Sequence, residues 1–243
     1  MTLPPLFSHN FPSYVKDRFN NDVEIMWYHP HFTQSRYPPG QKRSEACTLI
    51  CLLVAARISR ENLLIYDIES CPRFNIIIAE AMIEGNATHA WLVKEKIISH
   101  PYLNTEDALN CGGESLKILK EWKFYIFREQ IETTLYKNIN IFFHEWHRAS
   151  KSHNLYMLLI TCGRTILFMF QENTRKVTLF DSHSHIIDIN LNYGIVVAQT
   201  TIDKLESLCS WYIQVVLKGC YNLQVKKYEL AFLYSCDADA EWS

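Results

Sequence analysis

The chain has 243 residues, of which 48% are hydrophobic and 21% are charged, as in an ordinary soluble globular domain. This composition excludes a disordered chain, a collagen-like chain and a polar tail protein. Lysine and arginine number 24 against 26 acidic residues, a formal net charge of -2, so no basic surplus favours binding to nucleic acid. We expect one domain with a large buried core.

The first 43 residues are rich in proline, asparagine, histidine and aromatic side chains. Their prolines, among them the pairs Pro4–Pro5 and Pro38–Pro39, prevent a long helix. We therefore expect an extended lead-in over residues 1–43 that wraps the surface, with a strand near Val23–Tyr28.

Residues 44–60 have a different character. Ser44 can cap a helix, and the residues that follow are apolar on every side, which is typical of a helix buried in the middle of a fold. The pattern predicts further helices over 75–99, with a weak point at Gly85-Asn86, over 105–120, with a break at 111–113, and over 129–148.

From residue 154 on, the pattern is typical of short strands separated by turns. The predicted strands lie at 155–162, 165–171, 176–180, 194–199 and 224–234, and an amphipathic helix lies at 205–217. Helices followed by an antiparallel sheet predict an α+β fold. We expect the domain to cover residues 44–235 and an acidic tail to cover 236–243.

Several classes of site have no sequence support. The 7 glycines form no G-x-G-x-x-G or G-x-x-x-x-G-K loop, so we expect no cofactor, and the 8 cysteines contain no C-x-x-C pair that would indicate structural zinc. No signal peptide is visible in residues 1–19, and the longest apolar run, Leu49 to Ala56, is too short to span a bilayer. We therefore expect an intracellular protein, cytoplasmic or nuclear, with free thiols and no membrane partner.

Cys47 is the first candidate for chemistry. If Ser44 caps the buried helix, Cys47 stands at the third helical position, where unsatisfied N–H groups and the helix dipole favour a thiolate. A thiolate is the reactive form of cysteine, so a nucleophile would be placed here. The alternative is a structural role, since cysteine is among the most buried residue types.

The second candidate is the segment 181–185, which follows a predicted strand. In an extended chain Asp181, His183 and His185 share one face, because side chains alternate. A carboxylate beside a histidine fixes its tautomer and stabilises the imidazolium. A polar loop after a strand is the alternative interpretation.

Taken together, the two candidates resemble papain-like cysteine proteases, in which a cysteine starts a buried helix and a later sheet bears the histidine. The chain is most similar to deubiquitinase-type members such as the herpesvirus large-tegument deubiquitinase. The matching segments are Gln41–Cys47, Thr178–His183 and Gly194–Val197. The resemblance covers the framework from about residue 40 to 235, but residues 60–150 match nothing we can name.

The resemblance implies a papain-like fold whose buried N-terminal helix carries the cysteine and packs on an antiparallel sheet. It also implies cleavage of a peptide or isopeptide bond, with ubiquitin or a ubiquitin-like protein as the partner. Cys47 would be the nucleophile, His183 the general base and then acid, and Asp181 the residue that orients His183. Gln41, six residues before Cys47, would donate its amide to the oxyanion hole beside the Cys47 N–H. In the commoner papain-like order, His153 would be the base and Asp181 its partner; we prefer His183.

Two other functions stay open. A metal-dependent hydrolase could use Asp181, His183 and His185, since imidazole and carboxylate suit zinc or manganese. However, the 58 residues after His185 contain no further histidine, so we expect no metal. A non-catalytic papain-like interaction module is the second alternative, because a fold does not determine a function.

Overall fold

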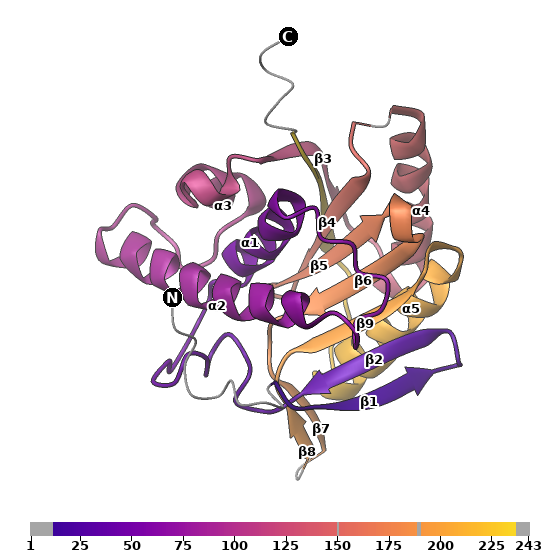
Figure 1. Cartoon of the computed structure of the whole chain (residues 1–243), viewed down its shortest axis with the longest axis horizontal. Helices are drawn as coiled ribbons and strands as arrows, with labels where there is room; N and C mark the ends of the chain where they lie inside the picture. Colours follow the sequence, from indigo (N-terminus) through magenta and orange to yellow (C-terminus); the bar gives the residue numbers. More distant parts are fainter. Residues whose placement is uncertain (1–11, 150, 189–190, 237–243) are drawn as a thin grey trace.

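Runs of aliphatic and aromatic residues pair into an eight-stranded antiparallel sheet in a computed structural model that describes residues 12–149, 151–188 and 191–236 (Figure 1). From one edge to the other, the strands are β1 (Tyr14–Phe19), β2 (Val23–Tyr28), β9 (Val196–Thr201), β6 (Lys176–Asp181), β5 (Arg164–Gln171), β4 (Asn154–Thr161), β10 (Tyr228–Ser235) and β3 (Leu119–Phe127). A separate hairpin joins β7 (His185–Asp188) to β8 (Leu191–Tyr193).

The alternation of side chains along the strands gives the sheet two apolar faces. In β2, Met26 and Tyr28 belong to one core, whereas Ile25 and Trp27 belong to the other. Because both faces are covered, the central strands are continuous apolar runs with little polar alternation.

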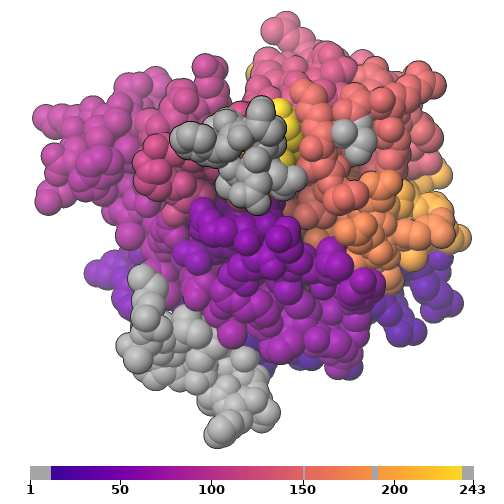
Figure 2. All heavy atoms as spheres, turned by 45° about the horizontal axis from the view of Figure 1, so that its top comes forward, coloured from indigo at the N-terminus to yellow at the C-terminus, as the bar shows by residue number. Residues whose placement is uncertain are grey.

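One face of the sheet is covered by α1 (Cys47–Arg60), α2 (Pro72–Lys94) and α3 (Thr105–Cys111) (Figure 1). Every residue of α1 is buried except Arg57 and Arg60, which explains why its sequence is apolar on all sides. In the space-filling view, purple residues from the N-terminal half of the chain and orange residues from the C-terminal half adjoin on one surface (Figure 2). Within the described ranges, no helix has both the length and the apolar character that a bilayer span requires.

The other face is covered by α4 (Ile131–Ala149), α5 (Leu205–Trp211) and the π-helical segment η4 (Tyr212–Cys220). In α4 the buried apolar residues recur at helical spacing and include Leu135, Ile139, Phe142 and Trp146. The sheet is therefore the middle of three layers, with one helical layer packed on each of its faces.

The predicted α+β fold is confirmed, with a buried helix carrying Cys47 on an antiparallel sheet. The sheet also continues into the predicted lead-in: β1 and β2 pair with each other, and β2 pairs with β9. The helix predicted over 105–120 was wrong at its end, where β3 forms instead and pairs with β10. Both β1 and β3 are edge strands rich in charged residues, and their pairing depends on partners that a local pattern does not reveal.

The predicted weak point at Gly85-Asn86 is a continuous part of α2. A Cβ added at Gly85 would lie 2.6 Å from Cγ1 of Ile50 and 3.3 Å from its backbone nitrogen, so glycine is what allows α1 and α2 to approach. The Asn86 side chain donates to the backbone carbonyls of Gln34 and Tyr37 at 2.9 and 3.1 Å. Both residues therefore serve packing rather than a break in the helix.

We predict that Gly85→Ala lowers the free energy of unfolding by about 1–3 kcal/mol, because the added methyl forces α1 and α2 apart. Gly219→Ala is the matched control: it lies in η4, and its nearest neighbour would be 3.4 Å away. An exposed glycine in a helical segment gains up to about 1 kcal/mol from alanine. Urea unfolding followed by circular dichroism measures both variants. Equal gains in the two proteins would contradict the close approach.

Candidate active site

Cys47 is the first residue of α1, and 4% of its surface is exposed. The prediction that Ser44 caps this helix was wrong. Ala46 occupies the N-cap position, and the Ser44 hydroxyl accepts the Ala46 N–H at 3.1 Å in the turn before the helix. Cys47 therefore stands even closer to the positive end of the helix than predicted, among backbone N–H groups that have no partner within the helix.

Asp181 is the last residue of β6, His183 follows two residues later, and the two side chains contact each other directly. Nδ1 of His183 lies 2.6 Å from Oδ1 of Asp181, and the backbone N–H of His183 donates to the same oxygen at 3.0 Å. Asp181 is fully buried, and 12% of the His183 side chain is exposed. Because Nδ1 is engaged by Asp181, the other ring nitrogen of His183 is the one left for the Cys47 thiol, and each of these two side chains shifts the pKa of the other.

Burial and charge oppose each other in these three groups. Burial raises the pKa of the Cys47 thiol, but His183 and Thr165 together lower it, so the pKa of Cys47 lies below its ordinary value. Burial lowers the pKa of His183, but Asp181 and Cys47 raise it to about 9. Burial raises the pKa of Asp181, but the charges of His183 and His185 hold it well below the ordinary range. The site thus favours a thiolate and an imidazolium over the neutral pair.

A groove of about 380 Å³ opens onto Cys47 and His183. Four segments form its walls: the loop before α1, the loop before α3, the turn between β4 and β5, and the residues after His183. The other lining residues are Gln34, Ser35, Arg43, Ser44, Glu45, Tyr102, Cys162, Gly163, Arg164 and Ser184. The reactive pair is therefore accessible from one side while its carboxylate partner stays buried.

His153 does not reach this groove. It precedes β4, whose opposite end leads into the groove about 25 Å away at the usual rise per strand residue. Its imidazole is 76% exposed and lies 3.7 Å from Glu172. The alternative base considered from the sequence is therefore excluded by position.

The third member of the predicted cluster, His185, contacts Asp181 from the other side, with Nε2 3.2 Å from Oδ2. The two histidines thus face different oxygens of one carboxylate rather than a common point. Within the described residues, no group of three or more histidine, cysteine, aspartate or glutamate side chains is arranged to hold a metal ion. This geometry does not favour the metal-dependent alternative.

Gln41 does not line the groove; its side-chain amide donates to the carbonyl of Arg43. A different glutamine, Gln34, lies in the groove. Its side chain lines the groove, its Oε1 accepts from the Ser182 hydroxyl at 2.6 Å, and its Nε2 donates to the Ser44 carbonyl at 3.0 Å. Sequence reasoning missed Gln34 because it is 13 residues from Cys47 and belongs to no local motif.

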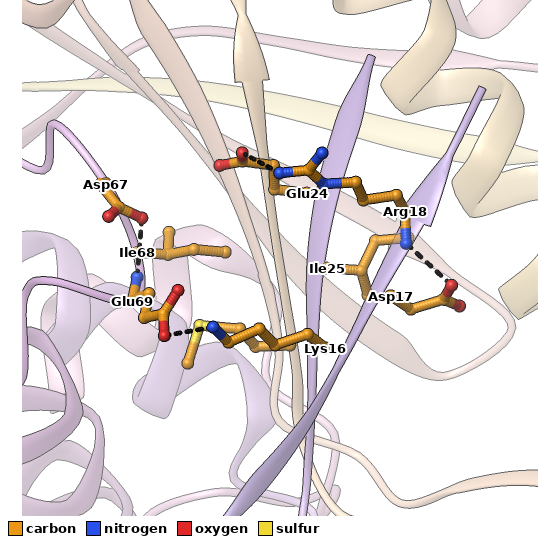
Figure 3. Close-up of a pocket in the computed structure, with 9 residues that line it drawn as sticks. Lys16, Asp17, Arg18, Glu24, Ile25, Asp67, Ile68 and Glu69 are labelled. Carbon is orange, nitrogen blue, oxygen red and sulfur yellow. Dashed lines mark hydrogen bonds and ion pairs between the residues drawn. The ribbon is translucent and has the colours of Figure 1, made fainter. Parts of the chain in front are cut away.

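A larger cavity, of about 620 Å³, lies beside β1 and β2 and is lined partly by residues 67–69 (Figure 3). Its two basic side chains each contact a carboxylate: Lys16 pairs with Glu69 and Arg18 with Glu24. Its nine lining residues include no cysteine, histidine or hydroxyl group. It offers charge pairs but no nucleophile, so the smaller groove at Cys47 is the candidate site.

Comparison with known proteins bears on the fold. No family model and no curated protein sequence matches the chain. The ubiquitin-specific protease encoded by a murine cytomegalovirus tegument protein, solved with a ubiquitin-based suicide substrate, matches with a TM-score of 0.50 and 11% identity over 87% of this chain and 88% of its own. The avirulence protein AvrPphB of Pseudomonas matches with a TM-score of 0.44 and 12% identity over 79% of this chain and 95% of its own.

This protein has a papain-like fold. The likeness to the viral protease extends over most of both chains and confirms the fold predicted from the sequence. It concerns the arrangement of the backbone, so the chemistry of the groove is argued from the residues of this chain.

We predict that iodoacetamide alkylates Cys47 rapidly at pH 6, and that His183→Ala slows this reaction about tenfold or more at that pH. The physical reason is that removing the imidazole leaves burial as the main influence, which raises the pKa of the thiol. Mass spectrometry of the labelled peptides gives the rate at each cysteine. Cys162, an exposed free thiol in the same groove, is the internal control and should react alike in both proteins. Identical Cys47 rates in both would contradict the ion pair.

Proposed function

We propose that this protein is a thiol-dependent hydrolase that cleaves a peptide or isopeptide bond, with ubiquitin or a ubiquitin-like protein as the substrate. The observation that carries the proposal is that Cys47, at the start of a buried helix, lines one groove with His183, whose ring hydrogen-bonds Asp181. These are the three roles that acyl transfer to a thiol requires: a nucleophile, a base beside it and a group that orients the base.

The chemistry follows from the arrangement. The Cys47 thiolate attacks the carbonyl carbon, and the carbonyl oxygen takes up the negative charge. The imidazolium of His183 then protonates the departing amine, which leaves a thioester on Cys47. A water molecule, deprotonated by His183, hydrolyses the thioester and regenerates the thiolate. Asp181 keeps its charge throughout and holds the ring of His183 in one tautomer.

In this proposal, Gln34 and the backbone N–H of Cys47 hold the oxyanion. Gln34 is 3% exposed and its amide nitrogen carries two hydrogens, of which the Ser44 carbonyl accepts one. Its carbonyl oxygen is held by Ser182, so the amide cannot turn over without losing that bond. A donor fixed in this way requires no reorganisation when charge develops on the substrate.

Three observations support an extended protein substrate. Arg164 forms part of the groove wall, and its guanidinium is a donor suited to a substrate carbonyl. The hairpin that begins two residues after His183 exposes Ile186, Ile187 and Leu191, an apolar surface suited to a protein partner. The fold is shared with a protease that was solved with a ubiquitin-based substrate.

The proposal also favours a reducing compartment, in line with an intracellular location. All eight cysteines are free thiols, including the exposed Cys162 close to the candidate nucleophile. A thiolate nucleophile keeps its activity where neighbouring thiols are not oxidised to disulfides.

We predict that a ubiquitin derivative with a C-terminal electrophile forms a covalent adduct with the protein at Cys47. Cys47→Ala should abolish both the adduct and hydrolysis of a ubiquitin conjugate, because Cys47 is the thiol whose pKa His183 lowers. Intact-protein mass spectrometry and gel assays measure the two effects. Hydrolysis that persists in Cys47→Ala would overturn the thiol mechanism. Alkylation of Cys47 by iodoacetamide without any reaction with ubiquitin would overturn the substrate and retain the thiol mechanism.

We predict that Gln34→Ala lowers kcat by about 10²–10³-fold, because the developing oxyanion loses one of its two donors. Gln41→Ala is the matched control, since its amide donates to the Arg43 carbonyl outside the groove and should leave kcat within about twofold. Thermal melts of both variants separate lost chemistry from lost folding. A large loss in Gln41→Ala together with normal activity in Gln34→Ala would restore the role that the sequence suggested for Gln41.

A further inference from the structure

His185 takes no part in the mechanism above, yet it is fully buried against the carboxylate on which that mechanism depends. It is the first residue of β7. Its Nε2 lies 3.2 Å from Oδ2 of Asp181, and its Nδ1 lies 2.7 Å from the carbonyl oxygen of Gly194. Both ring nitrogens are therefore within hydrogen-bond distance of oxygen atoms.

Both of these oxygens are acceptors without a hydrogen to give. Asp181 is held in its ionised form, and the Gly194 carbonyl cannot donate. A neutral imidazole has a single N–H and can satisfy only one of the two oxygens, which would leave its bare nitrogen facing the other. An imidazolium has two N–H groups and satisfies both. The contacts on the ring thus select the doubly protonated form.

The charges of the buried groups agree with this assignment. The Cys47 thiolate and the Asp181 carboxylate carry two negative charges, and the His183 imidazolium carries one positive charge. A second positive charge on His185 makes the group of four neutral, whereas a neutral His185 leaves these four side chains with one net negative charge; Arg164, in the groove wall, is a further positive charge nearby. Buried charges are tolerated where they are compensated by partners of opposite sign.

The surroundings of the ring also suit a cation. The Trp27 ring lies 5.4 Å from the His185 ring in an edge arrangement, and the Tyr221 ring lies 5.6 Å away. Ionisable groups from several elements packed around the ring face this region. They are Asp181 of β6, Tyr193 of β8, Tyr212 and Cys220 of η4, Tyr221 just after η4, and Arg164 of β5. The Arg164 guanidinium lies 3.6 Å from the centre of the Tyr221 ring. Asp181 is the acidic group among them, so it is the counter-charge of His185.

The Gly194 carbonyl, which faces Nδ1 of the His185 ring, is held rigidly. The N–H of Gly194 donates to the carbonyl of Tyr28 at 2.8 Å. A Cβ at Gly194 would lie 2.2 Å from the carbonyl oxygen of Phe32 and 2.3 Å from that of His29, so only glycine fits here and its carbonyl has little freedom. A donor held between this carbonyl and Asp181 fixes where Oδ2 points.

We propose that His185 is a positioning residue that acts as a buried imidazolium: it clamps Oδ2 of Asp181 against the Gly194 carbonyl, which leaves Oδ1 aligned on Nδ1 of His183. The proposal rests on the proposed thiol mechanism. Tyr212 assists, because its hydroxyl donates to the same Oδ2 at 3.2 Å. His185 touches neither the substrate nor the reacting atoms; it acts through Asp181.

A positive charge on His185 affects how activity depends on pH, because the pKa of Cys47 sets the acid limb of the pH–rate profile and the pKa of His183 sets the basic limb. A positive charge favours the Cys47 thiolate and opposes the His183 imidazolium. Removing it makes the thiol harder to ionise and lets His183 keep its proton to higher pH. Both limbs of the pH–rate profile should therefore move to higher pH, by about half a unit to one unit for the loss of one nearby charge. Loosened packing alone would lower the rate without moving both limbs in the same direction.

The test uses two variants of His185, each of which keeps one of its two hydrogen bonds. The amide nitrogen of His185→Gln can replace Nε2 and still donate to Asp181, whereas that of His185→Asn can replace Nδ1 and donate to Gly194. Neither variant carries a charge. His153→Gln, the same change at an exposed histidine, is the control.

The acid limb is measured by the rate of Cys47 alkylation with iodoacetamide, and the basic limb by kcat/KM against a ubiquitin conjugate. We expect both limbs to move to higher pH in both variants, with kcat falling at least tenfold further in His185→Asn than in His185→Gln and KM unchanged. The control should match the unmodified protein. Profiles of both variants that coincide with the unmodified profile would overturn the proposal.

A direct measurement keeps the proposal testable if the variants do not fold. Nitrogen-15 NMR of histidine side chains in the unmodified protein, assigned through the backbone, distinguishes an imidazolium from a neutral ring. Two protonated nitrogens on His185 at pH 7 support the proposal, and one bare nitrogen overturns it. If the unmodified Cys47 shows no enhanced alkylation at acid pH, the thiol mechanism fails, and the NMR result still decides the charge of His185.

Discussion

The ionised carboxylate of Asp181, buried at the end of β6, is the constraint on which the site depends. Its two oxygens accept from different partners: Oδ1 from the ring and the backbone N–H of His183, and Oδ2 from His185 and the Tyr212 hydroxyl. An ionised group without water must be surrounded by donors, since an unpaired buried charge is costly. The fold therefore places a histidine on each side of this carboxylate, and one of them reaches the Cys47 thiol.

The site lies where the two helical layers meet across the end of the sheet. Cys47 comes from α1, on one face, whereas Tyr212 comes from the core on the opposite face and holds Asp181. Tyr212 begins a π-helical segment that directly continues α5, and such segments often occur at functional sites. His183 follows β6, a central strand of the sheet, and lines the groove together with Cys47.

The loop before α1 is organised by contacts with distant parts of the chain. Gln34 bonds through its side chain to Ser44, just before Cys47, and to Ser182, between Asp181 and His183, so it connects the two halves of the candidate site. Asn86 supports Gln34 from α2, and the approach of α2 to α1 depends on the glycine that precedes Asn86. The packing of α2 on α1 and the geometry of the groove are thus coupled through the buried hydrogen bonds of Asn86 and Gln34.

The sequence by itself determined the α+β class, the buried helix and most central strands, because continuous apolar runs reflect burial whatever the partner is. It also singled out Cys47, Asp181 and His183, since a helix start and strand alternation are local geometry. Only the tertiary structure decided what depends on distant contacts: the edge strands β1 and β3, the position of His183 rather than His153 in the groove with Cys47, and the placing of Gln34 rather than Gln41 there. His185 shows the same limit, because its second acceptor, the Gly194 carbonyl, is set by strand pairing that no local pattern contains. Local periodicity determines which side chains share a face, whereas the partner that each face meets depends on how the whole chain closes.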